Sequence, residues 1–123
     1  MPRFRFSYKP ACLGLLWLAL LPAAGALELE TPHYKVRITP QCEEGEVSCD
    51  QVDYLGTHKE NGRSLKLRGR THHTLCADGV TPCRFLGYIF RRGNTTYWVG
   101  EDGTLRVTTG KRLLLEERGE WVD

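Results

Sequence analysis

The sequence predicts an all-β fold: a small antiparallel barrel or sandwich of seven to eight short strands, held together by disulfides. Three observations predict it. Apolar and polar residues alternate with a period of two over much of the chain, turn-forming glycines separate the alternating segments, and four cysteines lie in two matched segments. After residue 26, no segment shows the roughly 3.6-residue period of an amphipathic helix.

The first 26 residues have the features of a secretory signal peptide. Basic residues precede an apolar run at residues 13–21, and Ala24-Gly25-Ala26 supplies the small residues that signal peptidase requires. A membrane anchor is the alternative, but the run is shorter than the roughly 20 residues of a spanning helix. We therefore expect cleavage of residues 1–26, a single mature domain over residues 27–123, a periplasmic or secreted location and no stable membrane anchor.

Removal of the signal changes the charge of the chain. The full sequence has 17 Lys and Arg residues against 15 Asp and Glu residues. Three of the basic residues, Arg3, Arg5 and Lys9, belong to the signal. The mature chain therefore has 14 basic against 15 acidic residues and a net charge of −1. We expect no general electrostatic attraction to nucleic acid or to anionic membranes.

Four of the five cysteines remain after Cys12 leaves with the signal. Cys42 and Cys49 bound one segment, Cys76 and Cys83 bound another of equal length, and each has a glycine near its middle. Four cysteines allow three pairings. Local bridges, 42–49 and 76–83, are favoured because each segment can close on itself. A crossed pairing between the segments is the alternative.

His72 and His73 raise the question of a metal site. Neighbouring residues of a strand point to opposite faces, so we expect one half-buried and one solvated histidine. Zinc bound with the cysteines is the alternative. The cysteine spacing is longer than that of structural zinc modules, and an exported chain meets an oxidising compartment. We expect neither a metal nor a cofactor.

Alternation and turn signals divide the mature chain into strands. We expect strands at residues 33–39, 50–57, 63–70, 84–92, 95–100, 104–109 and 112–117, with an eighth over 71–76. Asn61-Gly62 and Asp102-Gly103 match type I′ turns, and Gly93-Asn94 matches a type II′ turn.

The segment 84–92 differs from the others because it is apolar on both faces. Strict alternation gives it one face with Phe85 and Ile89 and another with Leu86, Tyr88 and Phe90. Gly87, in the middle of the segment, indicates a bulge, a bend or a close backbone approach.

The hairpin that follows this segment is the candidate binding surface. Arg91 and Arg92 end the strand, and Tyr97 and Trp98 lie on the next one with side chains on opposite faces. Tyrosine, tryptophan and arginine are enriched at interface hot spots. The predicted partner-binding residues are Tyr88, Arg91, Arg92, Tyr97 and Trp98.

Two charge patterns are interpreted as ordinary solvated surface. If the strand around residue 68 is continuous, a basic ladder forms on one face from Lys66, Arg68, Arg70 and His72. The acidic loop at residues 43–46, with Asp50, could instead be a contact loop or a calcium contact.

The sequence contains no recognisable catalytic motif. Ser48 and Ser64, the two serines after the signal, lie outside nucleophile motifs, and zinc-protease and phosphate-loop patterns do not occur. We therefore predict no catalytic residue and do not expect an enzyme.

Arg84-Phe85, residues 87–90 and Arg91-Arg92-Gly93 follow one another as an aromatic strand and a basic-glycine turn. In this order the C-terminal half resembles the exported C-type lysozyme inhibitors of Gram-negative bacteria. The resemblance implies a compact antiparallel β-barrel, with Arg92 in the place of a lysine presented to the catalytic acids of lysozyme. The family's serine has no match; Thr81 is nearest. The placement of the cysteines also differs.

We therefore expect a non-enzymatic, exported protein-binding module. Its expected role is that of a periplasmic inhibitor of a cell-wall hydrolase, of the lysozyme-inhibitor or toxin-immunity type, with a lysozyme-like hydrolase or a toxin as partner. The alternative is a structural or accessory β-module of an envelope complex, and a small hydrolase comes third.

Overall fold

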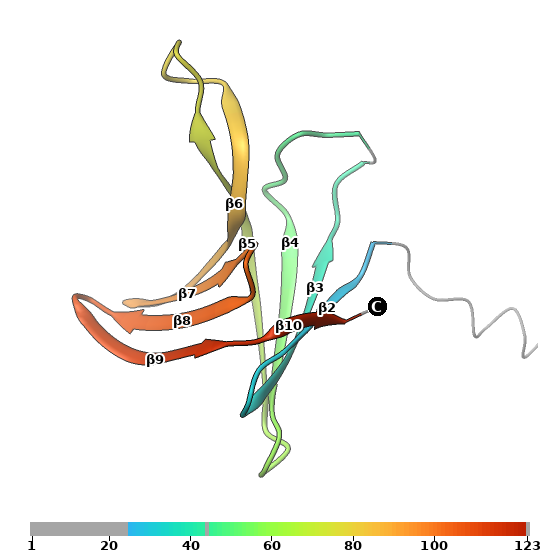
Figure 1. Ribbon diagram of the computed structural model, residues 1–123, viewed down its shortest axis with the longest axis vertical. Coiled ribbons are helices and arrows are strands. Elements are labelled where there is room, and N and C mark those ends of the chain that lie inside the picture. Colours follow the sequence, from blue (N-terminus) through green and yellow to red (C-terminus); the bar gives the residue numbers. More distant parts are fainter. Residues whose placement is uncertain (1–24, 44, 123) are drawn as a thin grey trace, which may run out of the picture.

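The computed structural model describes residues 25–43 and 45–122, which form nine antiparallel strands in one sheet (Figure 1). The strands are β2 (Leu27–Glu30), β3 (Tyr34–Pro40), β4 (Val52–His58), β5 (Ser64–Leu75), β6 (Pro82–Arg92), β7 (Thr95–Gly100), β8 (Thr104–Thr109), β9 (Arg112–Arg118) and β10 (Glu120–Val122). Within these residues there is no helix. The predicted all-β class is confirmed, in the form of a nearly closed barrel.

Closure of the barrel depends on the last strands. The sheet order is β10-β2-β3-β4-β5-β6-β7-β8-β9, and only Gly119 separates β9 from β10. One extended stretch of chain therefore pairs with β8 at its start and with β2 at its end. The amide of Gly119 donates a hydrogen bond to the Gly103 carbonyl at 2.8 Å. A Cβ at residue 119 would lie 2.1 Å from the Glu30 carbonyl oxygen, so the junction admits only glycine without a shift.

The predicted strand positions agree closely with the observed ones. β7 and β8 match their predicted bounds, and residues 63–70 and 71–76 are joined in the single strand β5. β2 and β10 were not predicted, because four and three residues are too few to show a period. The count is therefore nine rather than seven to eight.

Alternation along the strands directs one apolar face into the barrel. The interior contains buried side chains from six strands: Leu29, Val36, Ile38, Val52, Tyr54, Tyr88, Phe90, Val99 and Leu105. Burial of a large apolar side chain stabilises a fold by about 1.5–3 kcal/mol. The regular exchange of buried and exposed positions, as in β4, follows directly from the two-residue period of a strand.

The predicted type I′ turns are wrong. Among the described residues, none other than glycine has a positive φ, so Asn61 and Asp102 do not adopt the left-handed conformation that a type I′ turn requires. The connections there are longer than two residues, spanning 59–63 and 101–103. The two-residue connection Gly93-Asn94 has its positive φ of 60° at the glycine, which agrees with the predicted type II′ turn.

The prediction for the faces of β6 is partly wrong. His72 pairs with Gly87 while His73 pairs with Phe85, so Leu86 is an extra residue in a β-bulge. The bulge reverses the alternation and places Phe85 against Tyr88, with ring centroids 5.1 Å apart, instead of on the face of Ile89. The close backbone approach predicted at Gly87 is confirmed, because a Cβ there would lie 2.4 Å from the Val99 carbonyl oxygen.

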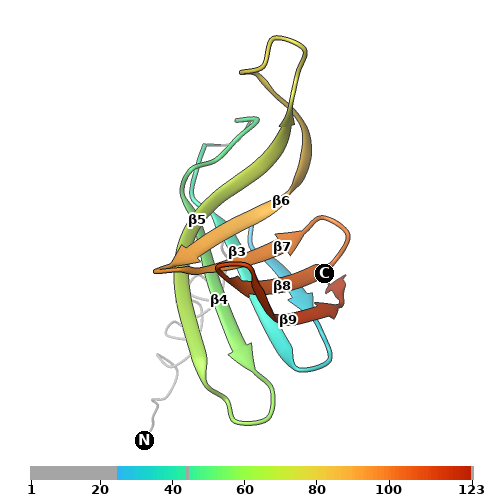
Figure 2. The same cartoon turned by 90° about the vertical axis from the view of Figure 1, so that its left-hand side faces the viewer.

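Both favoured disulfides are confirmed. Cys42 and Cys49 close the loop between β3 and β4, with Cα atoms 5.7 Å apart. Cys76 and Cys83 close the tip of the β5–β6 hairpin, with Cα atoms 5.2 Å apart. Figures 1 and 2 show this hairpin projecting well beyond the barrel. The two bridges indicate an oxidising environment outside the cytoplasm.

The predicted signal peptide lies outside the described residues except for Gly25 and Ala26. In the part of the chain that the structure describes, no helix has the length and apolar character needed to cross a membrane.

Gly87→Ala tests the close approach at the bulge. The added methyl group meets the backbone of β7, which cannot move without breaking its pairing, so we expect a loss of about 2–4 kcal/mol in the free energy of unfolding. Urea unfolding with both disulfides intact, followed by circular dichroism, measures it. Gly93→Ala is the control: it has a positive φ but an open surrounding, and should cost about 1–2 kcal/mol. Equal losses in the two variants would show that β7 does not crowd Gly87.

Candidate functional site

The structure divides the predicted binding residues between the two faces of the sheet. Tyr88 is 7% exposed and belongs to the core, so it offers little surface to a partner. Tyr97 lies on the inner face, 5.8 Å from Tyr54 between ring centroids. Arg91 and Arg92 are exposed at the end of β6, whereas Trp98 lies on the outer face. The five residues therefore do not form one surface.

Trp98 lies over two glycines on the outer face of the barrel. Its ring atoms approach the positions where side chains of Gly87 and Gly100 would begin, at 3.0 and 3.1 Å. The ring of His72 meets it edge-on at 5.7 Å, and Ile89 is its cross-strand neighbour on β6. The indole can pack directly on the sheet because these two glycines, on adjacent strands, have no side chains beneath it.

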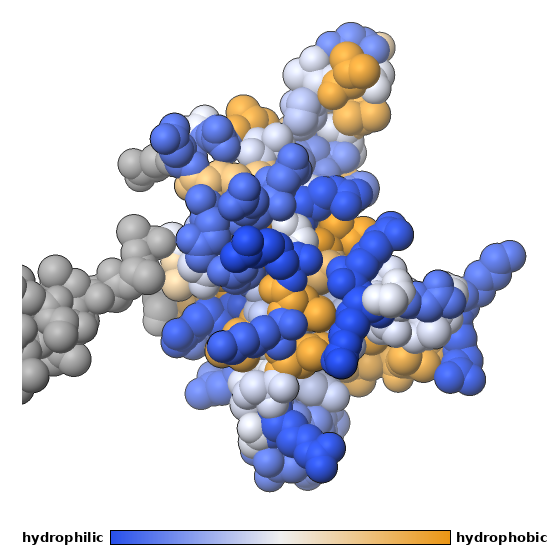
Figure 3. All heavy atoms as spheres, turned by 180° about the vertical axis from the view of Figure 1, so that it is seen from behind, coloured by the Kyte–Doolittle hydropathy of each residue, from blue (hydrophilic) through white to orange (hydrophobic). Residues whose placement is uncertain are grey.

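The predicted basic ladder is present because β5 is continuous. Lys66, Arg68 and Arg70 are exposed on its outer face. Arg68 forms an ion pair with Asp53 at 2.9 Å, and hydrogen bonds from Gln41 and Arg68 lower the pKa of that carboxyl. Hydrophilic side chains also crowd the middle of the face seen in Figure 3, with apolar surface between them. An exposed ion pair of this kind is worth at most about 1 kcal/mol, so the ladder contributes charge more than stability.

The most unusual surface is formed by the two disulfide-bridged loops, residues 42–43 and 45–49 and residues 76–83, here called the disulfide-closed end. Val47 on the first loop is 68% exposed, and Val80 on the second is 76% exposed. Leu75, which leads into the second loop, is 59% exposed. Each loop therefore presents an exposed aliphatic side chain, and a disulfide holds each loop.

Hydrogen bonds fix the tip of the β5–β6 hairpin further. The Asp78 carboxylate accepts hydrogen bonds from the amides of Val80 and Thr81, at 3.0 and 2.9 Å, and from the Thr81 hydroxyl. The Thr81 hydroxyl and these amides lower the pKa of Asp78 to about 2. The tip is therefore ordered by its own side chains as well as by its disulfide.

A groove lies between the first loop and the base of the β5–β6 hairpin. Its volume is about 580 Å³, and its walls include Cys42, Val47, Thr71, Phe85 and Tyr88. Cys49 and Thr71 hold the first loop against β5, because the amide of each donates to an oxygen of the other, at 2.9 and 2.8 Å. The first loop and the base of the hairpin thus form one continuous structure.

The disulfide-closed end and the residue that follows it carry acidic groups. Glu43 and Glu46 are exposed on the first loop, and Asp50 follows it. Within the described residues, none of the three forms an ion pair. Nearby on β6, Arg84 is the exposed cation. This part of the surface therefore has a negative local charge and favours a basic partner surface.

A second hollow lies at the barrel mouth, and we call it the mouth pocket. It has a volume of about 450 Å³ and is lined by the rings of three tyrosines, by aliphatic side chains of β8 and β9 and by residues of the β4–β5 hairpin. Leu114 reaches it because a bulge interrupts the β8–β9 pairing: Val107 pairs with Leu115 but Thr108 with Leu113. Regular alternation does not predict this pocket, because Leu114 reaches it only through the bulge.

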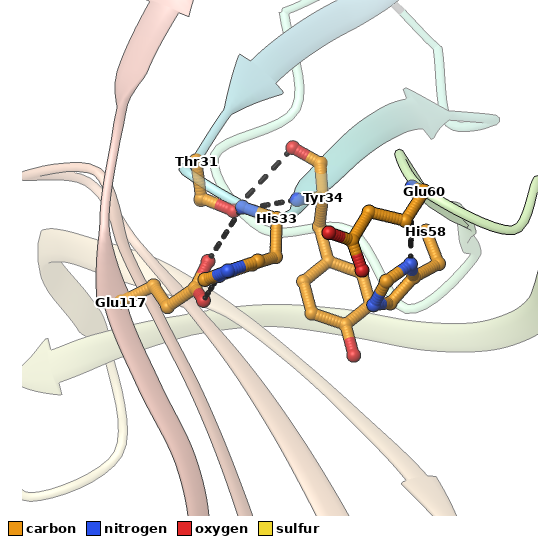
Figure 4. Close-up of polar contacts among 6 residues, drawn as sticks. All are labelled: Thr31, His33, Tyr34, His58, Glu60 and Glu117. Carbon is orange, nitrogen blue, oxygen red and sulfur yellow. Dashed lines mark hydrogen bonds and ion pairs between the residues drawn. The ribbon is translucent and has the colours of Figure 1, made fainter.

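Polar contacts join the β2–β3 turn to β9 (Figure 4). Glu117 Oε2 lies 2.5 Å from Nδ1 of His33, and Oε1 accepts a hydrogen bond from the His33 amide at 3.2 Å. Thr31, which is buried, accepts a hydrogen bond from the Tyr34 amide at 3.1 Å. Burial tends to raise the pKa of Glu117, but hydrogen bonds from Thr31 and His33 outweigh it and hold that pKa below its ordinary value.

His72 and His73 point to opposite faces, as predicted. His73 is half-buried, with its ring 5.5 Å from that of Phe85, while His72 is exposed. All four cysteines that a zinc site could have used are in disulfides. Across residues 25–43 and 45–122, three or more His, Cys, Asp or Glu side chains nowhere gather in a way that could hold a metal ion.

Comparison of this chain with protein-family models, with curated proteins and with solved structures finds no match. The resemblance to the lysozyme inhibitors therefore stays a prediction, and function has to be argued from the geometry.

Glu117→Gln tests the polar contact that holds the β2–β3 turn to β9. The folded state lowers the pKa of Glu117 from 4.5, so its carboxylate stabilises the fold above that pH and loses the effect as pH falls through the lowered value. We expect the variant to lose about 1–2 kcal/mol of unfolding free energy at pH 7, and the difference to shrink between about pH 5 and 3. Glu116→Gln, which removes only an exposed pair with Arg106, should cost less than about 1 kcal/mol. A pH-independent difference at residue 117 would contradict this account.

Proposed function

We propose that this chain is a non-enzymatic, exported protein-binding module that inhibits a cell-wall hydrolase, and that it docks through the disulfide-closed end. One observation carries the proposal: two loops, each bridged by a disulfide, hold Val47 and Val80 in solvent at the same end of the barrel. We expect the protein to work in the periplasm or after secretion, where such bridges persist.

The rigidity of these loops supports binding. A mobile loop loses conformational entropy when it binds, at about 0.5–1.5 kcal/mol for each immobilised side chain. Here the Cys76–Cys83 bridge and the hydrogen bonds to Asp78 have already fixed the tip. Burial of Val80 and Val47 against a partner would then contribute to affinity with little of that loss. Projection of the hairpin beyond the barrel allows the tip to enter a cleft (Figure 2).

Charge and resemblance together suggest the class of partner. The exposed acidic side chains of the first loop, Glu43 and Glu46, favour a partner with basic groups around its contact surface. The resemblance to lysozyme inhibitors suggests a lysozyme-like hydrolase or a toxin of similar activity. The resemblance singles out Thr81, which directly precedes β6, and Arg92, which ends it, about 35 Å apart if the strand is extended. One small site could not use both, and we place docking at the Thr81 end.

Inhibition of a purified C-type lysozyme on peptidoglycan tests this directly. The wild-type protein should reduce turnover at near-stoichiometric concentration. Val80→Asp should raise the inhibition constant by about tenfold or more, because it places a charge at the centre of the contact. Arg92→Glu, at the other end of β6, should leave the constant unchanged. The reverse result would move docking to the arginine hairpin, and no inhibition by a stoichiometric excess of wild type would exclude a C-type lysozyme as the target.

Affinity capture separates inhibition from an accessory role. The protein, with disulfides intact, is used to capture partners from periplasmic extract, alongside Val80→Asp and Arg92→Glu. A hydrolase retained by wild type and Arg92→Glu but lost with Val80→Asp fits the proposal. If a component of an envelope complex is captured in the same pattern, the proposed docking surface is correct but the role is accessory and not inhibitory.

A further inference from the structure

The mouth pocket has the composition of a ligand site. Its volume of about 450 Å³ falls within the roughly 300–1,000 Å³ of small-molecule pockets. It shares no residue with the disulfide-closed end, so neither its occupant nor its test depends on the proposed function. We propose that the mouth pocket binds a small amphipathic carboxylate, with its apolar body among the tyrosines and leucines and its carboxylate on Arg63.

The walls of the pocket suit an apolar body. Of its lining residues, Leu105 and Val107 are buried, whereas Leu114 is 49% exposed. The β9 bulge brings Leu114 there; without the extra residue, regular alternation would place it on the outer face, opposite to Leu115. An aliphatic side chain left half in water beside an apolar hollow gains free energy when a ligand covers it, at about 25 cal/mol for each Å² removed from water.

The pocket also has hydroxyl groups that form no hydrogen bond within the described part of the chain. The hydroxyls of Tyr34, Tyr54 and Tyr97 make no hydrogen bond with any of the described residues. They lie near one another: burial raises the pKa of Tyr54, and the neighbouring hydroxyls of Tyr97 and Tyr34 raise it further. Tyr54 is only 4% exposed and lines the pocket. A ligand oxygen can accept hydrogen bonds from these phenols.

The positive charge of Arg63 favours an anionic ligand in the mouth pocket. It lies on the β4–β5 hairpin, contributes to the pocket lining, and forms no ion pair with the acidic groups of the described chain. A guanidinium can bind a carboxylate through two parallel hydrogen bonds. Glu60, on the same hairpin, lies beside Tyr34 and His58 and is not part of the lining (Figure 4). The cation at the rim is therefore free to meet a ligand.

Titration with decanoate, below its micelle-forming concentration, tests the inference by calorimetry and by amide and methyl NMR. The exported protein should bind one decanoate saturably, with shifts at Tyr97, Leu114 and Leu115. Decanol, which has the same chain without the charge, should bind about tenfold more weakly or worse. Arg63→Gln should reduce the affinity for decanoate to that for decanol. Arg84→Gln, an exposed arginine on β6 outside the pocket, should leave decanoate binding unchanged.

Three results would overturn the inference. The first is no saturable binding of decanoate. The second is binding with shifts outside the mouth pocket. The third is equal affinity for decanoate in wild type and Arg63→Gln, which would mean that the charge of Arg63 does not select the ligand. Since Arg63 is exposed and its side chain forms no ion pair within the described residues, loss of folding is not expected to obscure the comparison.

Discussion

The fold depends on one extended stretch, residues 112–122, pairing with both edges of the sheet. β9 pairs with β8, and after Gly119 the chain pairs with β2 through β10. Without this junction, β2 and β8 would leave two rows of backbone donors and acceptors open to water or to other chains. Two close approaches occur where this stretch meets the start of the sheet. Gly119 lies against the Glu30 carbonyl, and Glu117 contacts His33. The core is enclosed because this stretch pairs with both β8 and β2.

Most strands of the barrel could be predicted because each is indicated by residues close together in the sequence. A period of two and a glycine turn identify β7 and β8 to the residue, and equal cysteine spacing identifies both bridges. Closure could not be predicted in this way. β2 and β10 are too short to show a period, and His33 and Glu117 are separated by 84 residues, so only the folded chain brings them together. The type I′ turns failed for a related reason: Asn-Gly and Asp-Gly permit that turn, but loop length decides whether it forms.

The candidate sites were less predictable than the fold because they depend on bulges. A single extra residue reverses the alternation of every residue beyond it. The bulge at Leu86 directs the side chain of Phe85 inward, to the groove beside the first disulfide loop. The bulge on β9 directs the side chain of Leu114 toward the mouth pocket. The alternation predicted for Tyr97 and Trp98 is confirmed, and it places these two candidate residues on opposite faces of the sheet.

The position of the disulfides bears on what the loops are for. In the chain-entropy estimate, a bridge across a loop of this length stabilises the fold by about 2–3 kcal/mol wherever it lies. Only Cys49 of the four cysteines is buried in the barrel core, and the Cys76–Cys83 bridge lies at the far tip of a hairpin that extends past the barrel. A bridge placed there does little to hold the barrel strands together, since their pairing does not require the tip. Its direct effect is to fix the conformation of the tip, together with Asp78. A fixed, projecting tip with an exposed valine is of most use in binding, which is why we assign the disulfide-closed end to a partner and the mouth pocket to a ligand.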